Sequence, residues 1–176
     1  RFIINESNIR ICRPVARLKK EKQMPIDIQN QRSLSKISTK TLKTIVRTIC
    51  ADSGFSDSEL SIVIMDDAGI HDLNLTWRSK DKPTDVLSFP QAEGRVAPGD
   101  FVPCLGDIVI SAETAARQAV EIGHGLEDEY RRLLVHGFLH LLGHDHVHGG
   151  HQARNMKQEE NRLLEVLDKE LGSPQA

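Results

Sequence analysis

The segment from Leu133 to His151, LLVHGFLHLLGHDHVHGGH, constrains the chain most, because six of its eight histidines fall within it. His136 and His140 lie four positions apart in a stretch with the apolar spacing of a helix, so their side chains share one helix face. Gly143 predicts the end of that helix, since glycine accepts the left-handed backbone found after helices. The chain can then turn back and bring His146 to the same point.

Three imidazoles gathered in this way predict a site for one zinc ion. Three protein ligands leave a fourth coordination position for water, as in catalytic zinc sites, whereas structural sites use four protein ligands. Zinc-bound water loses its proton near neutral pH and becomes a nucleophile. We therefore expect His136, His140 and His146 to be metal ligands; the alternative is that they are ordinary core or surface histidines.

The polar residues around this motif allow more than one role. Asp145 either orients a ligand imidazole or caps the turn. His144 either supports the ligands or faces solvent, and His148 and His151 are expected in a polar loop.

The spacing H-x-x-x-H-x-x-G-x-x-H is that of the metzincin proteases, but one catalytic residue of those proteases is missing. They carry a glutamate general base directly after the first histidine, where this chain has Gly137. General-base assistance contributes typically about 10²–10⁴-fold to the rate. The chain therefore has the ligand spacing of a protease without its proton acceptor.

Hydrophobic periodicity along the rest of the chain predicts a single α+β domain. The predicted strands are 24–31, 59–67, 85–89 and 105–111, and the predicted helices are 38–55, 67–78, 111–123, 125–143 and 151–172. We expect a small mixed sheet packed by about five helices. In the second helix, Ile70, Leu73, Leu75 and Trp77 are expected to lie partly inward.

Length and charge limit the class of protein further. A chain of 176 residues suits one domain, assigned here to residues 24–172. Residues 1–22 carry seven basic and two acidic side chains, which predicts a disordered basic leader over 1–23; an RNA-contacting arm and a transit-peptide remnant are the alternatives. The net charge of −2 means that an RNA partner would need a local basic patch.

Cysteine usage and hydropathy bear on the location of the protein. Cys12, Cys50 and Cys104 are far apart and form no C-x-x-C motif, which indicates reduced residues of an intracellular protein. No apolar run reaches the eighteen or so residues of a membrane span. We expect a cytoplasmic location, or an organellar one if the leader is a transit-peptide remnant, and no membrane partner.

Three blocks of the sequence resemble the YbeY family of single-strand-specific endoribonucleases. They are the histidine block 136–146, LNLTWRSKDKPTDVLSFP at 73–90 and LGDIVIS at 105–111. Their order and spacing agree with the family over roughly residues 25–170. The resemblance implies a zinc enzyme that acts on single-stranded rRNA in small-subunit 3′-end processing and in ribosome quality control, with the ribosome or a ribosomal subunit as partner. It also implies that the three histidines are the ligands and that the metal cleft lies beside the sheet.

The second block adds candidate RNA-binding residues. By the resemblance, Arg78 matches the family's functionally important arginine, and its guanidinium can bind the scissile phosphate or stabilise the charge developing on it. The alternative is a salt bridge to Asp81 or Asp85. Lys80 and Lys82 either contact RNA or belong to a solvated turn.

Two further residues and two further functions remain open at this point. Asp107 is expected to hydrogen-bond a ligand histidine or the loop backbone, and Trp77 either stacks on a base or lies in the core. The competing functions are a metalloprotease-like hydrolase that lacks the usual glutamate base and a non-catalytic ribosome assembly factor with structural zinc.

Overall fold

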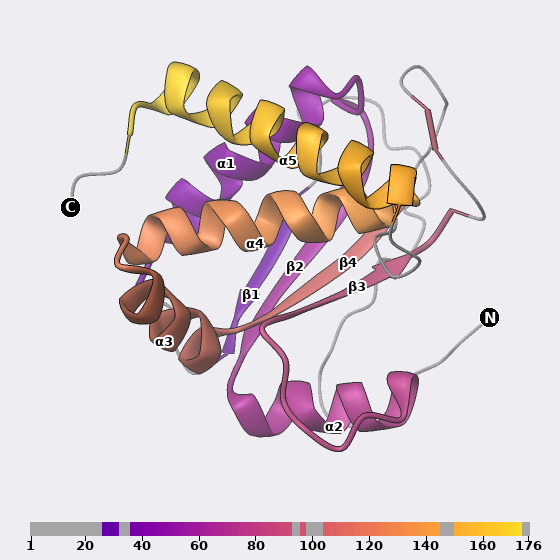
Figure 1. The fold of residues 1–176 in the computed structure, drawn as a ribbon, viewed down its shortest axis with the longest axis vertical. Helices are drawn as coiled ribbons and strands as arrows, with labels where there is room; N and C mark the ends of the chain where they lie inside the picture. Colours follow the sequence, from indigo (N-terminus) through magenta and orange to yellow (C-terminus); the bar gives the residue numbers. More distant parts are fainter. Residues whose placement is uncertain (1–25, 32–35, 93–95, 98–103, 145–149, 174–176) are drawn as a thin grey trace.

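A four-stranded mixed sheet with helices on both faces makes up the described part of the chain. The computed structural model describes residues 26–31, 36–92, 96–97, 104–144 and 150–173 (Figure 1). The strands are β1 (Ile26–Asn30), β2 (Glu59–Met65), β3 (Val86–Pro90) and β4 (Cys104–Ser111). The helices are α1 (Thr39–Asp52), α2 (Asp67–Arg78), α3 (Ala112–Ile122), α4 (Leu126–Leu141) and α5 (Gly150–Leu171). The predicted α+β class and mixed sheet are confirmed.

The order of the strands places β3 at an edge of the sheet. The order is β1-β2-β4-β3, in which β1, β2 and β4 run parallel and β3 pairs antiparallel with β4. Ser88 of β3 pairs with Ile108 of β4, and Leu87 pairs with Val109. Because side chains alternate along a strand, Ser88 and Leu87 point to opposite faces of the sheet.

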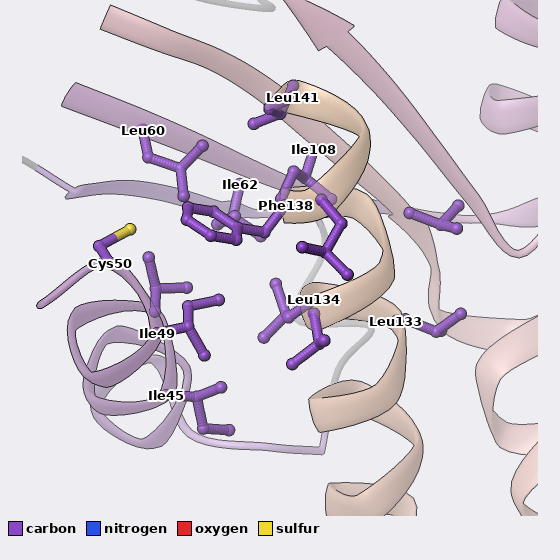
Figure 2. Packing of buried hydrophobic residues seen from close by; sticks show 14 of the residues in the cluster. Ile45, Ile49, Cys50, Leu60, Ile62, Ile108, Leu133, Leu134, Phe138 and Leu141 are labelled. Atoms are coloured by element: carbon purple, nitrogen blue, oxygen red, sulfur yellow. The ribbon is translucent and has the colours of Figure 1, made fainter. Parts of the chain in front are cut away.

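The larger core lies on the face that is covered by α1, α4 and α5. Phe138 and Leu134 of α4 pack between the α1 residues and the strand residues, including Ile62 and Ile108 (Figure 2). These side chains are fully buried, and each such burial stabilises the fold by roughly 1.5–3 kcal/mol. Helix α4 therefore sits directly on the sheet.

Helix α2 covers the opposite face over a smaller apolar cluster. Ile70 packs there with the strand residues Val63, Leu87 and Val109. The prediction that Leu75 and Trp77 lie partly inward was wrong in extent: these two side chains are 46% and 40% exposed. Ile70 and Leu73 of α2 pack in this cluster, whereas Trp77, near the end of the helix, makes an edge contact with Phe89 of β3. No helix within the described ranges is long and apolar enough to cross a membrane.

The first turns of α2 and α3 are joined by one carboxylate. Asp67 accepts hydrogen bonds from the hydroxyls of Ser111 and Thr114 and from the guanidinium of Arg117. Partial burial by itself raises the pKa of Asp67, but these three hydrogen bonds outweigh burial and hold its pKa below the ordinary value. The ionised form of Asp67 is therefore favoured by folding.

We expect Asp67→Asn to lower the free energy of unfolding at neutral pH by roughly 1–2 kcal/mol, because hydrogen bonds to a charged acceptor are replaced by neutral ones. A depressed folded-state pKa stabilises the protein above the unfolded pKa, about 3.9, and this contribution is lost as the pH falls through the folded value. Urea unfolding of wild type and variant at neutral and acidic pH checks this. A difference in stability that stays constant across the acidic range would contradict it.

Candidate metal centre

Helix α4 places two of the predicted ligands side by side. His136 and His140 are half-buried, one turn apart, while the neighbouring Phe138 and Leu139 are buried in the core. Their Nε2 atoms are 3.1 Å apart, and their ring centroids are 4.7 Å apart at an interplanar angle of 75°. The rings therefore present one nitrogen each to a common point.

This separation suits two ligands of one ion. Tetrahedral zinc with Zn–N bonds of about 2.0–2.1 Å holds two ligand nitrogens roughly 3.3 Å apart. The third predicted ligand, His146, lies outside the described residues, as do Asp145 and His148. Across the part of the chain that the structure describes, no group of three metal-ligating side chains is assembled. His136 and His140 are thus two nitrogen donors that fit the predicted zinc ion.

A carboxylate that the sequence analysis did not single out contacts this pair. Oε1 of Glu160, on α5, lies 2.6 Å from Nδ1 of His136, and the Glu160 side chain is 15% exposed. The hydrogen bond from His136 is the main cause that holds the pKa of Glu160 below its usual value. Helical spacing held a signal for it: Glu160 shares the inward face of α5 with Met156, Leu163 and Leu167, which are buried.

Gly137 allows α4 to approach the sheet closely. A Cβ at this position would lie 2.9 Å from Cγ2 of Ile108 and 3.1 Å from Oγ of Ser88. Oγ of Ser88 also donates a hydrogen bond of 3.0 Å to the carbonyl oxygen of Gly137. The position that carries the general base in the metzincin proteases therefore faces the sheet here and has no room for a side chain.

We expect Gly137→Ala to destabilise the protein. Overpacking a filled core costs about 1–3 kcal/mol, which exceeds the gain of about 1 kcal/mol from replacing glycine by alanine in a helix. Urea unfolding should therefore show a net loss for the alanine variant. An alanine variant at least as stable as wild type would mean that α4 can move off Ile108 and Ser88 at no cost.

Arg78 lies across the sheet from the two histidines. It is the last residue of α2, the helix whose position relative to α4 is seen in Figure 1, and its side chain is exposed. Its neighbour Trp77 contacts Phe89 of β3 on that side, whereas Gly137 contacts Ser88 of the same strand on the other side. Arg78 and the histidine pair thus flank the edge strand β3, but the structure does not join them in one contact.

The predicted alternative of a salt bridge from Arg78 is not formed. Asp81 instead contacts Nε2 of His71 at 2.8 Å, and Asp85 contacts Gln118 at 3.2 Å. Within the described ranges, no hydrogen bond or ion pair engages the guanidinium of Arg78. Its charge is therefore available to a ligand.

Lys80 and Lys82 are exposed on a turn that is fixed by its backbone. The Lys80 N–H donates to the carbonyl oxygen of Asn74 at 3.2 Å, and the side-chain amide of Asn74 donates to the carbonyl oxygen of Lys82 at 2.7 Å. The two ammonium groups therefore project from an ordered turn directly after Arg78.

Asp85 attaches the start of β3 to α3 and α4. Its carboxylate accepts hydrogen bonds from the Val86 N–H at 2.9 Å, the Thr84 hydroxyl at 3.1 Å and Gln118 of α3 at 3.2 Å. The guanidinium of Arg132, on α4, is 3.6 Å away. Burial raises the pKa of Asp85, but these hydrogen bonds outweigh it and lower the pKa overall. The strand next to the site is thereby held in place at its first residue.

Asp107 is not brought to the described histidines. It is 6% exposed and, by alternation along β4, points to the same side as Val109, which packs against α2. Ile108, which meets Gly137, points to the other side. The structure therefore gives no support for a hydrogen bond from Asp107 to His136 or His140.

The remaining candidates are His144, His151 and a buried cysteine. His144 is half-buried at the end of α4 and lines a cavity of about 410 Å³ with residues that include Phe55 and Arg162. His151 is exposed in the first turn of α5, in agreement with the predicted helix 151–172 and not with a polar loop, and it contacts Asn155 at 3.0 Å. Burial raises the pKa of the Cys50 thiol to about 12, which excludes it as a nucleophile.

The chain matches one family model over most of its length. The model, described as endoribonuclease YbeY, matches residues 21–168. The chain belongs to the YbeY family. The YbeY match includes all of β1 to β4 and α1 to α4 and most of α5, so it covers His136, His140 and Glu160.

Individual relatives agree with the YbeY assignment. A protein from Aquifex aeolicus named endoribonuclease YbeY is 52% identical over 118 residues, which cover 67% of this chain and 76% of the relative. One of the same name from Geobacter sulfurreducens is 41% identical over 147 residues, which cover 82% and 97%. A solution structure of a Thermotoga maritima protein has a TM-score of 0.57 at 26% identity, covering 83% of this chain and 91% of that one.

Proposed function

We propose that the chain is a zinc-dependent, single-strand-specific endoribonuclease that acts in rRNA maturation, at the 3′ end of the small-subunit rRNA, and in ribosome quality control. His136, His140 and His146 hold the zinc ion, and single-stranded rRNA and a ribosomal subunit are the partners in the cytoplasm. The observation that carries the proposal is the convergence of two imidazole nitrogens to 3.1 Å on α4. The endoribonuclease names of the relatives supply the substrate class.

The residues proposed to act on RNA lie on the two sides of β3. His136 and His140 present neutral nitrogens as ligands, and a bound zinc ion supplies a Lewis acid for the phosphate or an acidified water. Arg78 binds the phosphate from the other side of the strand as a planar, permanently charged donor. An RNA substrate brings its own 2′-hydroxyl as a nucleophile, which lessens the demand for a protein base at the position of Gly137.

The protease alternative is disfavoured by the packing of α4. A glutamate at position 137 would have to displace Ile108 or Ser88, and its carboxylate would point into the sheet rather than toward a substrate. Peptide hydrolysis by the metzincin mechanism therefore lacks its base for a geometric reason, in addition to the missing residue.

We expect purified wild-type protein to contain about one zinc ion per chain and to cleave a single-stranded rRNA fragment. His140→Ala should lose both zinc and cleavage while keeping a cooperative unfolding transition. His151→Ala, which removes an exposed histidine outside the pair, is the matched control and should retain both.

Elemental analysis, gel-based cleavage and circular dichroism provide the three measurements. Undiminished cleavage by metal-free wild type would refute the zinc-dependent mechanism. An unfolded His140→Ala protein would instead favour structural zinc, and hydrolysis of a peptide but not of RNA would favour the protease.

We expect Arg78→Ala to lower the rate of RNA cleavage by roughly 10²–10³-fold, because it removes one charged donor to the phosphate. Its zinc content and unfolding free energy should stay near those of wild type, since the guanidinium bonds to no described residue and such surface changes cost about 0.5 kcal/mol or less. Arg78→Lys, which keeps the charge but not the planar fork, should recover part of the rate. Full activity of Arg78→Ala would remove Arg78 from the mechanism.

A further inference from the structure

The carboxylate of Glu160 occupies a position where the packing of α5 calls for an apolar side chain. Met156, Leu163 and Leu167 lie four positions before it, three after it and seven after it, and all three are buried in the main core. Placing a carboxylate in such a row is unfavourable unless it gains a hydrogen-bonded partner. The partner that faces Glu160 is the imidazole of His136 on α4.

The contact between these two residues defines which nitrogen of His136 carries a proton. Oε1 of Glu160 and Nδ1 of His136 are 2.6 Å apart, and an ionised carboxylate can only accept hydrogen bonds. Nδ1 must therefore be the donor, and in the neutral imidazole Nε2 then carries the free lone pair. Nε2 is the atom that faces Nε2 of His140 at 3.1 Å.

The other partner of Glu160 contributes little to this arrangement. Nζ of Lys157 is 3.4 Å from Oε2 of Glu160, and the Lys157 side chain is 69% exposed. Exposed ion pairs of this kind contribute little to stability, because water screens the two charges. His136 is therefore the contact that fixes the carboxylate, and the carboxylate in turn fixes the imidazole ring.

We infer that Glu160 is a positioning residue for zinc: its carboxylate holds His136 in the Nδ1–H tautomer, with Nε2 aimed at the ion that His140 shares. This inference rests on the zinc site of the proposed function. Carboxylates that orient ligand histidines typically change metal affinity by about 10–100-fold when they are removed. A side chain of α5 thereby influences how tightly His136 of α4 binds zinc.

Two substitutions at position 160 test the inference by zinc binding. Glu160→Met fits the apolar row and removes the acceptor, and we expect zinc affinity to fall by about 10–100-fold. Glu160→Gln keeps an acceptor oxygen without the charge and should lose less. Glu159→Met, at the adjacent position that pairs with Arg162 instead, is the matched control and should bind zinc as wild type does.

Zinc affinity is measured on the full chain by competition with a chromophoric chelator, and thermal unfolding of the metal-free proteins verifies that each variant is folded. An affinity of Glu160→Met within about twofold of wild type would overturn the inference, since the expected loss is at least tenfold. If Glu160→Met fails to fold, a zinc affinity of Glu160→Gln equal to that of wild type would overturn the inference instead.

Nitrogen-15 NMR of the imidazoles gives a readout that a merely structural role would not change. In the neutral imidazole of His136 in metal-free wild type, the Nδ1 atom should carry the proton, and Glu160→Met should lose this preference. An unprotonated Nδ1 in wild type would overturn the inference even if zinc binds and RNA is cleaved. Loss of the proposed RNA cleavage alone would leave both readouts intact, so the two hypotheses fail separately.

Discussion

The close approach of α4 to the sheet is the constraint on which the rest of the site depends. At Gly137 the helix backbone rests on Ile108, and its carbonyl oxygen is hydrogen-bonded by Ser88. His136 lies one residue before this point and His140 lies within one turn after it, so both proposed ligands sit on a helix whose height above the sheet is fixed. Ligand geometry is most accurate when it is built on such rigid elements.

Most of the fold could be predicted from the sequence because its periodic segments are long and consistent. The limits of the helices and strands were recovered closely, and the mixed sheet followed from them. The exposure of Leu75 and Trp77 could not be predicted, because helical spacing defines a shared face but not how much of that face another element covers. The hydrophobic periodicity of a helix does not tell how much of that helix its neighbours will cover.

The site was predictable to the extent that its residues are close in sequence. The pairing of His136 and His140 follows from spacing on one helix, whereas the contact from Glu160 depends on how α5 docks twenty-four positions later in the chain. The separation of Arg78 from the histidines also depends on tertiary structure, because only the packing of α2 and α4 against the strands shows that they cover opposite faces. Neither the Glu160–His136 contact nor the separation of Arg78 from the histidines can be predicted from composition and spacing.

The inward row of α5 has a thermodynamic consequence. Met156, Leu163 and Leu167 anchor the last helix to the core, and Glu160 joins that same row to His136. Any ion held by His136 is therefore linked to the docking of this helix, since a ligand that binds only the docked form stabilises that form. Binding of the proposed ion at His136 and docking of α5 on the core would therefore be coupled in one equilibrium.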